Sequence, residues 1–141
     1  RHETCSGRNM VQEVMEATYR ETILSEGRNL QPRVIDSISR VTPDDFESGN
    51  IRGLFCCDDA DAIRLIGRLN AWGFSVPGRI RMVSYGNTEL ARYFTPAISS
   101  IDPHSAQIVG ITADIIRRHL KGESTALDQH MIQPDLIIRE T

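Results

Sequence analysis

From residue 51 onward the chain alternates short apolar runs with longer segments of helical periodicity, and this alternation constrains the fold more than any other feature. The apolar runs are typical of strands, and the segments between them carry apolar residues three and four positions apart, as amphipathic helices do. We expect strands at 51–57, 79–85, 97–101 and 131–138, and helices at 60–72, 88–94 and 102–121. Strands alternating with helices predict an α/β domain with a mostly parallel sheet flanked by helices.

The remaining segments add further expectations. Residues 9–26 favour a helix, and the β-branched run 33–37 favours a strand. Thr42 and Pro43 suit the start of a short helix. Pro134, inside the last expected strand, predicts an edge position or a bulge because proline cannot donate to the ladder.

The composition excludes several classes of protein. The 141 residues are 40% hydrophobic and 25% charged, which is enough apolar mass for a core. A net charge of −3 argues against this chain being a dedicated nucleic-acid binder. No apolar run approaches the roughly 18 residues that a membrane span needs, and no secretory signal is visible. The chain begins with Arg1 rather than Met, and we expect an excised piece of a longer protein.

Cysteine and histidine usage indicates neither a metal nor a redox site. The three Cys and four His show no ligand spacing, so we expect no metal and no cofactor. Cys56 and Cys57 are interpreted as small buried hydrophobic residues in a reducing compartment, which favours the cytoplasm. No nucleophile–base pair can be assembled, and we expect no enzymatic activity.

Polar residues follow two of the expected strands. Ligands of parallel α/β sheets sit in the crevice at the carboxyl ends of the strands, and this rule selects Asp58–Asp59 and the turn at 84–87. The two carboxylates have three possible roles: capping the next helix, accepting hydrogen bonds from a polyol or sugar, or binding Mg²⁺. Further carboxylates for Mg²⁺ are not assignable nearby.

From Ile51 to Thr141 the order and spacing of motifs become specific. The segments are IRGLFCCDDADA at 51–62, WGFSVPGRI at 72–80, MVSYGNTELARYFTP at 82–96, and PDLIIRET at 134–141. This pattern resembles the lac/gal repressor (LacI/GalR) family. Members show a strand ending in Asn-Asp, a Gly-hydrophobe-x-Val-Pro turn, a Gly-Tyr/Phe-Asp-Asp strand end and a Leu-x-x-Arg-Glu-Ser/Thr tail.

The resemblance implies a periplasmic-binding-protein-like fold, in which two Rossmann-like lobes hold a small-molecule effector between them. It places residues 1–100 and 129–141 in the C-terminal lobe and assigns 101–128 to a crossover helix of the N-terminal lobe. Family members bind operator DNA through an N-terminal helix-turn-helix, which this chain lacks. We also expect a homodimer and no membrane contact.

The resemblance also suggests effector-binding residues. Asp58 occupies the position of the family's Asn at the strand end, and Arg8 matches an effector-contacting arginine. Gly86 stands where a family Asp commonly binds sugar hydroxyls, so a typical aldose is not expected, and Asn87 is the substitute group. Together with Tyr85, these residues predict a site for a small polar effector.

Two other functions fit the same α/β pattern. Sugar-binding proteins of ABC importers share the fold, but the regulator-like tail and the lack of a signal peptide favour a cytoplasmic regulator. A phosphoacceptor receiver domain needs a lysine at a late strand end, and the only lysine, Lys121, ends the last expected helix. That helix carries an apolar stripe that we expect either to fold back on the lobe or to pack against a second copy.

Overall fold

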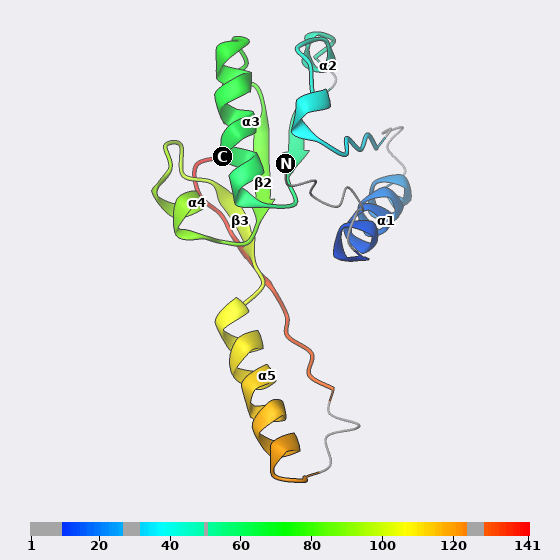
Figure 1. The fold of residues 1–141 in the computed structure, drawn as a ribbon. Helices are drawn as coiled ribbons and strands as arrows, with labels where there is room; N and C mark the ends of the chain where they lie inside the picture. Colours follow the sequence, from blue (N-terminus) through cyan, green and yellow to red (C-terminus); the bar gives the residue numbers. More distant parts are fainter. Residues whose placement is uncertain (1–9, 27–31, 50, 124–128) are drawn as a thin grey trace, which may run out of the picture. The chain divides into compact units, whose positions relative to one another are not determined.

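The computed structural model describes residues 10–26, 32–49, 51–123 and 129–141. The chain divides into two compact units, Arg1–Val41 and Thr42–Thr141. Figure 1 shows their secondary structure along the chain.

The first unit contains one long helix, α1 (Met10–Ser25), as the sequence predicts. The strand expected at 33–37 is wrong, because this segment forms no strand and leads into a 3₁₀ helix, η1 (Ile38–Arg40). The hydroxyl of Ser37 accepts a hydrogen bond from the N–H of Ser39 and so caps η1. A β-branched run forms a strand only where a neighbouring strand pairs with it, and the described part of this unit offers none.

The second unit is an α/β domain around one sheet. Its elements are α2 (Asp44–Glu47), β1 (Gly53–Phe55), α3 (Asp59–Ala71), β2 (Arg81–Tyr85), α4 (Glu89–Tyr93), β3 (Ser99–Asp102), α5 (Ser105–Leu120) and β4 (Asp135–Ile137). The strand order is β1-β2-β3-β4. The first three strands are parallel and β4 is antiparallel to β3, which confirms the mostly parallel sheet. The strand order places β4 at the edge, as expected for the last strand, but β4 is shorter than the expected 131–138 and begins only after Pro134.

The core of the second unit lies between α3 and the sheet. Ile66 and Leu69 of α3 are buried, and so are Met82 of β2 and Ile98 before β3. The i, i+3 spacing of apolar residues on α3 places them on one face of the helix. This packing fixes where α3 begins, directly beyond the carboxyl end of β1.

The two neighbouring cysteines differ in exposure. Cys56 is buried and burial raises the pKa of its thiol to about 12, so it behaves as a small hydrophobic residue. Cys57 is exposed, which corrects the expectation that both would be buried. The alternation of side chains along an extended segment explains the difference.

The start of the last long helix also differs from expectation. The helix expected at 102–121 starts three residues later, because Asp102 ends β3 and α5 begins at Ser105. An Asp side chain can also accept a hydrogen bond from the backbone two residues on, as in an Asx turn. The Asp102 carboxylate does so, 2.7 Å from the N–H of His104, and His104 adopts a left-handed conformation with φ of 55°.

Helix α5 contains no buried residue. In Figure 1 it follows β3, and the chain then returns to the sheet in β4. The expectation that the apolar stripe folds back onto the lobe is therefore wrong. The other alternative, packing against a second copy, stays a prediction.

Candidate functional site: the carboxyl edge of the sheet

The parallel strands β1, β2 and β3 end at the same edge of the sheet. Their registers pair Phe55 with Val83 and Tyr85 with Ile101. The residues that follow each strand are therefore brought to one place, here called the carboxyl edge. It contains Asp58, the turn Tyr85–Asn87, and Asp102.

Asp58 begins helix α3 and faces solvent. One of its carboxylate oxygens accepts a hydrogen bond from the N–H of Asp61 at 2.6 Å, so Asp58 is the N-cap. The capping role considered from the sequence is confirmed. A carboxylate has two oxygens with several lone pairs, so a cap leaves acceptor capacity for the hydroxyl of a ligand.

Asp59 has the opposite character, because it is buried with a relative exposure of 2%. Its carboxylate accepts hydrogen bonds from the hydroxyls of Ser84 and Ser100, which lie on β2 and β3 and are fully buried. It also accepts bonds from the N–H and the hydroxyl of Thr88, both at 2.7 Å. A single side chain thus joins the start of α3 to two strands and to the residue before α4.

The protonation of Asp59 follows from these contacts. Burial alone raises the pKa of this carboxyl, because it disfavours the charged form. The hydrogen bonds from Ser84, Thr88 and Ser100 favour the charged form and outweigh burial. The net pKa of Asp59 lies below the usual value for Asp, so the group is ionised at neutral pH.

Gly86 contributes backbone only to the edge. Its φ is 131°, which residues with a Cβ rarely adopt, and a Cβ there would lie 3.2 Å from a carboxylate oxygen of Asp59. Any side chain at position 86 would therefore be strained and would meet a charged group. The local geometry accounts for a glycine at this position.

Asn87 is held by three groups from other parts of the sheet. Its side-chain amide donates to the carboxylate of Asp102 at 2.8 Å, and its amide oxygen accepts a bond from the guanidinium of Arg139. Its backbone N–H donates to the hydroxyl of Ser100 at 2.9 Å. Because both ends of the side chain have intramolecular partners, Asn87 acts as a cross-link of the carboxyl edge.

Asp102 connects the edge to the start of α5. The N–H of His104, followed by the amide of Asn87, holds the pKa of Asp102 below its usual range. Nε2 of His104 lies 3.2 Å from the carboxylate of Asp135 at the start of β4. His104 thus bridges the segment that enters α5 and the segment that returns from it.

Tyr85 lines a groove of about 460 Å³ beside α5. The other lining residues are largely apolar: Pro103, Ile108, Ile111, Thr112, Ile115, His130, Ile132 and Pro134. Tyr85 is half-buried, with an apolar ring and a polar hydroxyl. It therefore adds one polar group to a largely apolar groove.

The structure brings together four of the five site residues expected from the sequence: Asp58, Tyr85, Gly86 and Asn87. The fifth, Arg8, lies outside the described residues. Sequence reasoning did not assign Arg139, whose Nη1 donates to the carbonyl of Ile98 at 2.6 Å while Nη2 holds Asn87.

Sequence reasoning also left Asp59 without a defined partner. A signal was present, since Ser84 and Ser100 interrupt apolar strands. A buried hydroxyl needs a hydrogen-bond partner, and a carboxylate at the same sheet edge is the nearest candidate.

Among the described residues, no group of three or more His, Cys, Asp or Glu is placed to hold a metal ion. None of the described helices is long and apolar enough to cross a membrane.

The chain belongs to the periplasmic binding protein-like domain family, which matches residues 4–141. The HTH-type transcriptional repressor PurR of Vibrio campbellii is 30% identical over 88 residues, covering 62% of this chain and 26% of that protein. The ribose operon repressor of Haemophilus influenzae is 23% identical over 95 residues, covering 67% and 29%. The chain thus spans little more than a quarter of the length of these relatives.

Solved structures share the fold. The transcription regulator CcpA of Lactococcus lactis superposes with a TM-score of 0.77 at 12% identity, covering 94% of this chain and 51% of that one. A periplasmic binding protein/LacI transcriptional regulator from Alkaliphilus metalliredigens, complexed with D-xylulofuranose, has a TM-score of 0.69 at 16% identity, covering 86% and 49%. The comparisons confirm the LacI/GalR resemblance and the α/β, periplasmic-binding-protein-like fold.

Proposed function

We propose that this chain is part of the effector-sensing domain of a LacI/GalR-type transcriptional regulator, which acts in the cytoplasm and binds operator DNA through a helix-turn-helix outside this chain. The observation that carries the proposal is the carboxyl edge, where three parallel strands deliver polar groups to one place in a fold that known regulators share. The effector is a small polar molecule, and the chain performs no catalysis.

The proposed effector site consists of Asp58, Tyr85, Gly86 and Asn87, with Arg8 as a fifth residue. Asp58 is exposed and accepts hydrogen bonds, and Tyr85 faces the groove. Gly86 offers backbone groups at a point where no side chain intervenes. Asn87 serves the site by fixing the turn, since both ends of its amide already have partners.

The proposed lobe arrangement assigns residues 1–100 and 129–141 to the C-terminal lobe and 101–128 to the N-terminal lobe. The exposure of α5 supports this division. A helix with an apolar face and no buried residue needs another surface to cover it. A first lobe supplied by the rest of the protein provides such a surface.

Asp58→Asn in the intact regulator tests the effector site. Asn is as good an N-cap as Asp, so the start of α3 is preserved. One of the two carboxylate oxygens, which accept hydrogen bonds, is replaced by an NH2 group, which donates them. We expect affinity for a polyol effector to fall by roughly 1–3 kcal/mol, the cost of a lost buried hydrogen bond. Isothermal titration calorimetry with D-xylulose, a ketose whose furanose form is bound by a fold neighbour, measures the change.

Asp61→Asn is the matched control for this titration. Asp61 lies one turn into α3, pairs with Arg64, and carries the same charge. Its replacement is expected to leave sugar affinity unchanged. Equal affinity of the Asp58→Asn variant and the unmodified regulator would show that Asp58 does not contact the effector, and no binding of D-xylulose would exclude that sugar as the effector.

Self-association of the 141-residue chain is a second expected outcome. Val109, Ile116 and Leu120 of α5 are 66%, 55% and 80% exposed. Covering such side chains gains roughly 1.5–3 kcal/mol each, and a twofold dimer is the commonest way to do so. Sedimentation velocity is expected to show a dimer that Ile116→Glu dissociates and Lys121→Glu does not. A monomer at all concentrations would contradict this prediction.

The transport alternative is decided by the coding sequence upstream of this chain. A helix-turn-helix there supports the regulator, whereas a secretory signal peptide supports a sugar-binding protein of an ABC importer. The curated relatives described above are repressors, which favours the regulator.

A further inference from the structure

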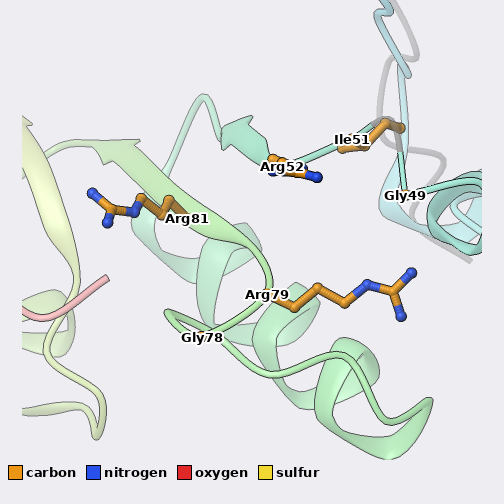
Figure 2. Close-up of a pocket in the computed structure, with 6 residues that line it drawn as sticks. All are labelled: Gly49, Ile51, Arg52, Gly78, Arg79 and Arg81. Carbon is orange, nitrogen blue, oxygen red and sulfur yellow. The ribbon is translucent and has the colours of Figure 1, made fainter.

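Three arginines gather at the edge of the sheet opposite to the carboxyl edge. Arg52 directly precedes β1, Arg81 is the first residue of β2, and Arg79 lies two residues before it. The backbone N–H of Arg81 donates to the carbonyl of Arg52 at 2.9 Å, which keeps the two strand starts side by side. A pocket of about 400 Å³ lies here, lined by Gly49, Ile51, Arg52, Gly78, Arg79 and Arg81 (Figure 2).

The charge of this arginine pocket is unbalanced. Its lining contains three guanidinium groups and no carboxylate. The salt bridges of the described residues involve Arg20, Arg40, Arg64, Arg117 and Arg118, together with His104, and none of the three pocket arginines. Like charges held close together repel, and an anion that binds among them relieves this repulsion.

Arg79 is held in place by contacts other than ion pairs. Its Nη2 donates to the carbonyl of Phe46 at 2.9 Å, and its guanidinium carbon lies 4.5 Å from the centre of the Phe74 ring. An arginine that is already ordered loses less side-chain entropy when it binds a ligand. The guanidinium carries five N–H donors, so the bond to Phe46 leaves others for an anion.

We propose that the arginine pocket binds a small phosphate-bearing anion, at a site separate from the effector site. The planar fork of a guanidinium matches two oxygens of a phosphate, and paired arginines are the preferred ligands of such groups. Figure 2 shows the side chains of Arg52 and Arg79 extending to the same side, while Arg81 extends to the other. Arg52 and Arg79 therefore contact the anion, and Arg81 adds its charge from the rim.

The shape of the pocket favours a small molecule over an acidic protein. The volume of about 400 Å³ is in the range of small-molecule sites. Protein interfaces are built around a buried apolar centre, often aromatic, and Ile51 is the one large apolar residue in this lining. Two glycines of the lining, Gly49 and Gly78, leave backbone accessible to a bound group.

Titration of the 141-residue chain with inorganic pyrophosphate tests the proposal. Calorimetry is expected to detect binding that weakens as salt is added, since the charges are near the surface. Arg52→Gln removes one of the two guanidinium groups that contact the anion. It is expected to weaken binding about tenfold, the equivalent of one charge-assisted hydrogen bond. Arg81→Gln removes only charge from the rim and is expected to have a smaller effect, about two- to threefold.

Controls separate this site from general attraction of anions. Arg92→Gln removes an exposed arginine of α4, outside the pocket, and is expected to leave affinity unchanged. Thermal unfolding without ligand establishes that each variant is folded, and Arg52→Lys keeps the charge while losing the fork. Equal losses for the Arg52, Arg81 and Arg92 variants, citrate binding as tightly as pyrophosphate, or no binding at millimolar pyrophosphate would each overturn the proposal.

Discussion

Replacement of Asp59 by alanine is expected to lower the free energy of unfolding by about 3–4 kcal/mol, close to the largest effects seen for single substitutions. The carboxylate accepts bonds from Ser84, Ser100 and both donors of Thr88. Removing it leaves the buried hydroxyl of Ser100 without its acceptor and that of Ser84 with only the carbonyl of Ser99, 3.5 Å away. Urea unfolding followed by circular dichroism at neutral pH measures the loss.

Asp58→Ala is the matched comparison for this experiment. The two aspartates are neighbours and carry the same charge, but Asp58 is exposed and accepts a single cap bond. Loss of an N-cap costs about 1 kcal/mol. Should Asp59→Ala prove too unstable to fold, Asp59→Asn keeps the volume and allows the same comparison. A loss at Asp59 no larger than that at Asp58 would contradict the assigned role.

The same carboxylate gives stability a defined pH dependence. The pKa of Asp59 is lower in the folded chain than in the unfolded one, where Asp has a value of about 3.9. The unfolded state therefore binds protons first as the pH falls, and the contribution of Asp59 is complete above about pH 5 and lost progressively below it. The variant Asp59→Asn lacks this group and is expected to lose less stability than the unmodified chain over that range.

Among the described residues, Asp102 and Asp114 also have lowered pKa values, and both are present in the unmodified chain and in the Asp59→Asn variant. The N–H of His104 lowers the pKa of Asp102, and the side chain of Arg117 lowers that of Asp114. The Asp59→Asn variant therefore keeps part of the acid sensitivity. The informative quantity is the difference between the two pH profiles, and identical profiles would contradict an ionised, hydrogen-bonded Asp59.

The sheet and its main helices could be predicted because the pattern and the packing agree. In α3 the apolar residues repeat at helical spacing, and the same residues are buried against β2. The last strand is an edge strand as expected, but it begins after Pro134, so the proline ends up outside the ladder rather than inside it. The strand expected at 33–37 failed because β-propensity depends on a pairing partner, which a linear pattern does not reveal.

The candidate site was predicted in location but only partly in role. Parallel strands bring their carboxyl ends together, and that rule placed Asp58 and the 85–87 turn at one edge. The sequence does not show that Asp59, rather than Asp58, is the buried aspartate. That depends on the hydroxyls of Ser84 and Ser100, which lie on neighbouring strands and bond to Asp59. Likewise, one of the three partners of Asn87 is Arg139, which is 52 positions away in the sequence. Long-range pairs of this kind are set by tertiary packing.

Replacement of Arg139 by methionine is expected to cost about 2–3 kcal/mol of stability, the value of one or two hydrogen bonds to a charged group in a half-buried setting. The guanidinium donates to the carbonyl of Ile98, a buried residue, and to the amide oxygen of Asn87. Methionine keeps the apolar part of the side chain, so most of the packing is retained. The backbone N–H of Arg139 still bonds the hydroxyl of Ser99, which keeps the chain end in place.

The behaviour of Asn87 in the Arg139→Met variant shows whether Arg139 holds this turn or only contributes to overall stability. Without the guanidinium, Asn87 keeps only Asp102 and Ser100 as partners, and its side-chain amide is expected to become more mobile. Nuclear magnetic resonance of the Asn87 side-chain amide detects this as faster hydrogen exchange. Arg92→Met, which removes an exposed arginine of α4, is the control and is expected to change neither stability nor exchange. Equal behaviour of the two variants would show that Arg139 does not hold the turn, and the positioning role of Asn87 would then depend on Asp102 and Ser100 alone.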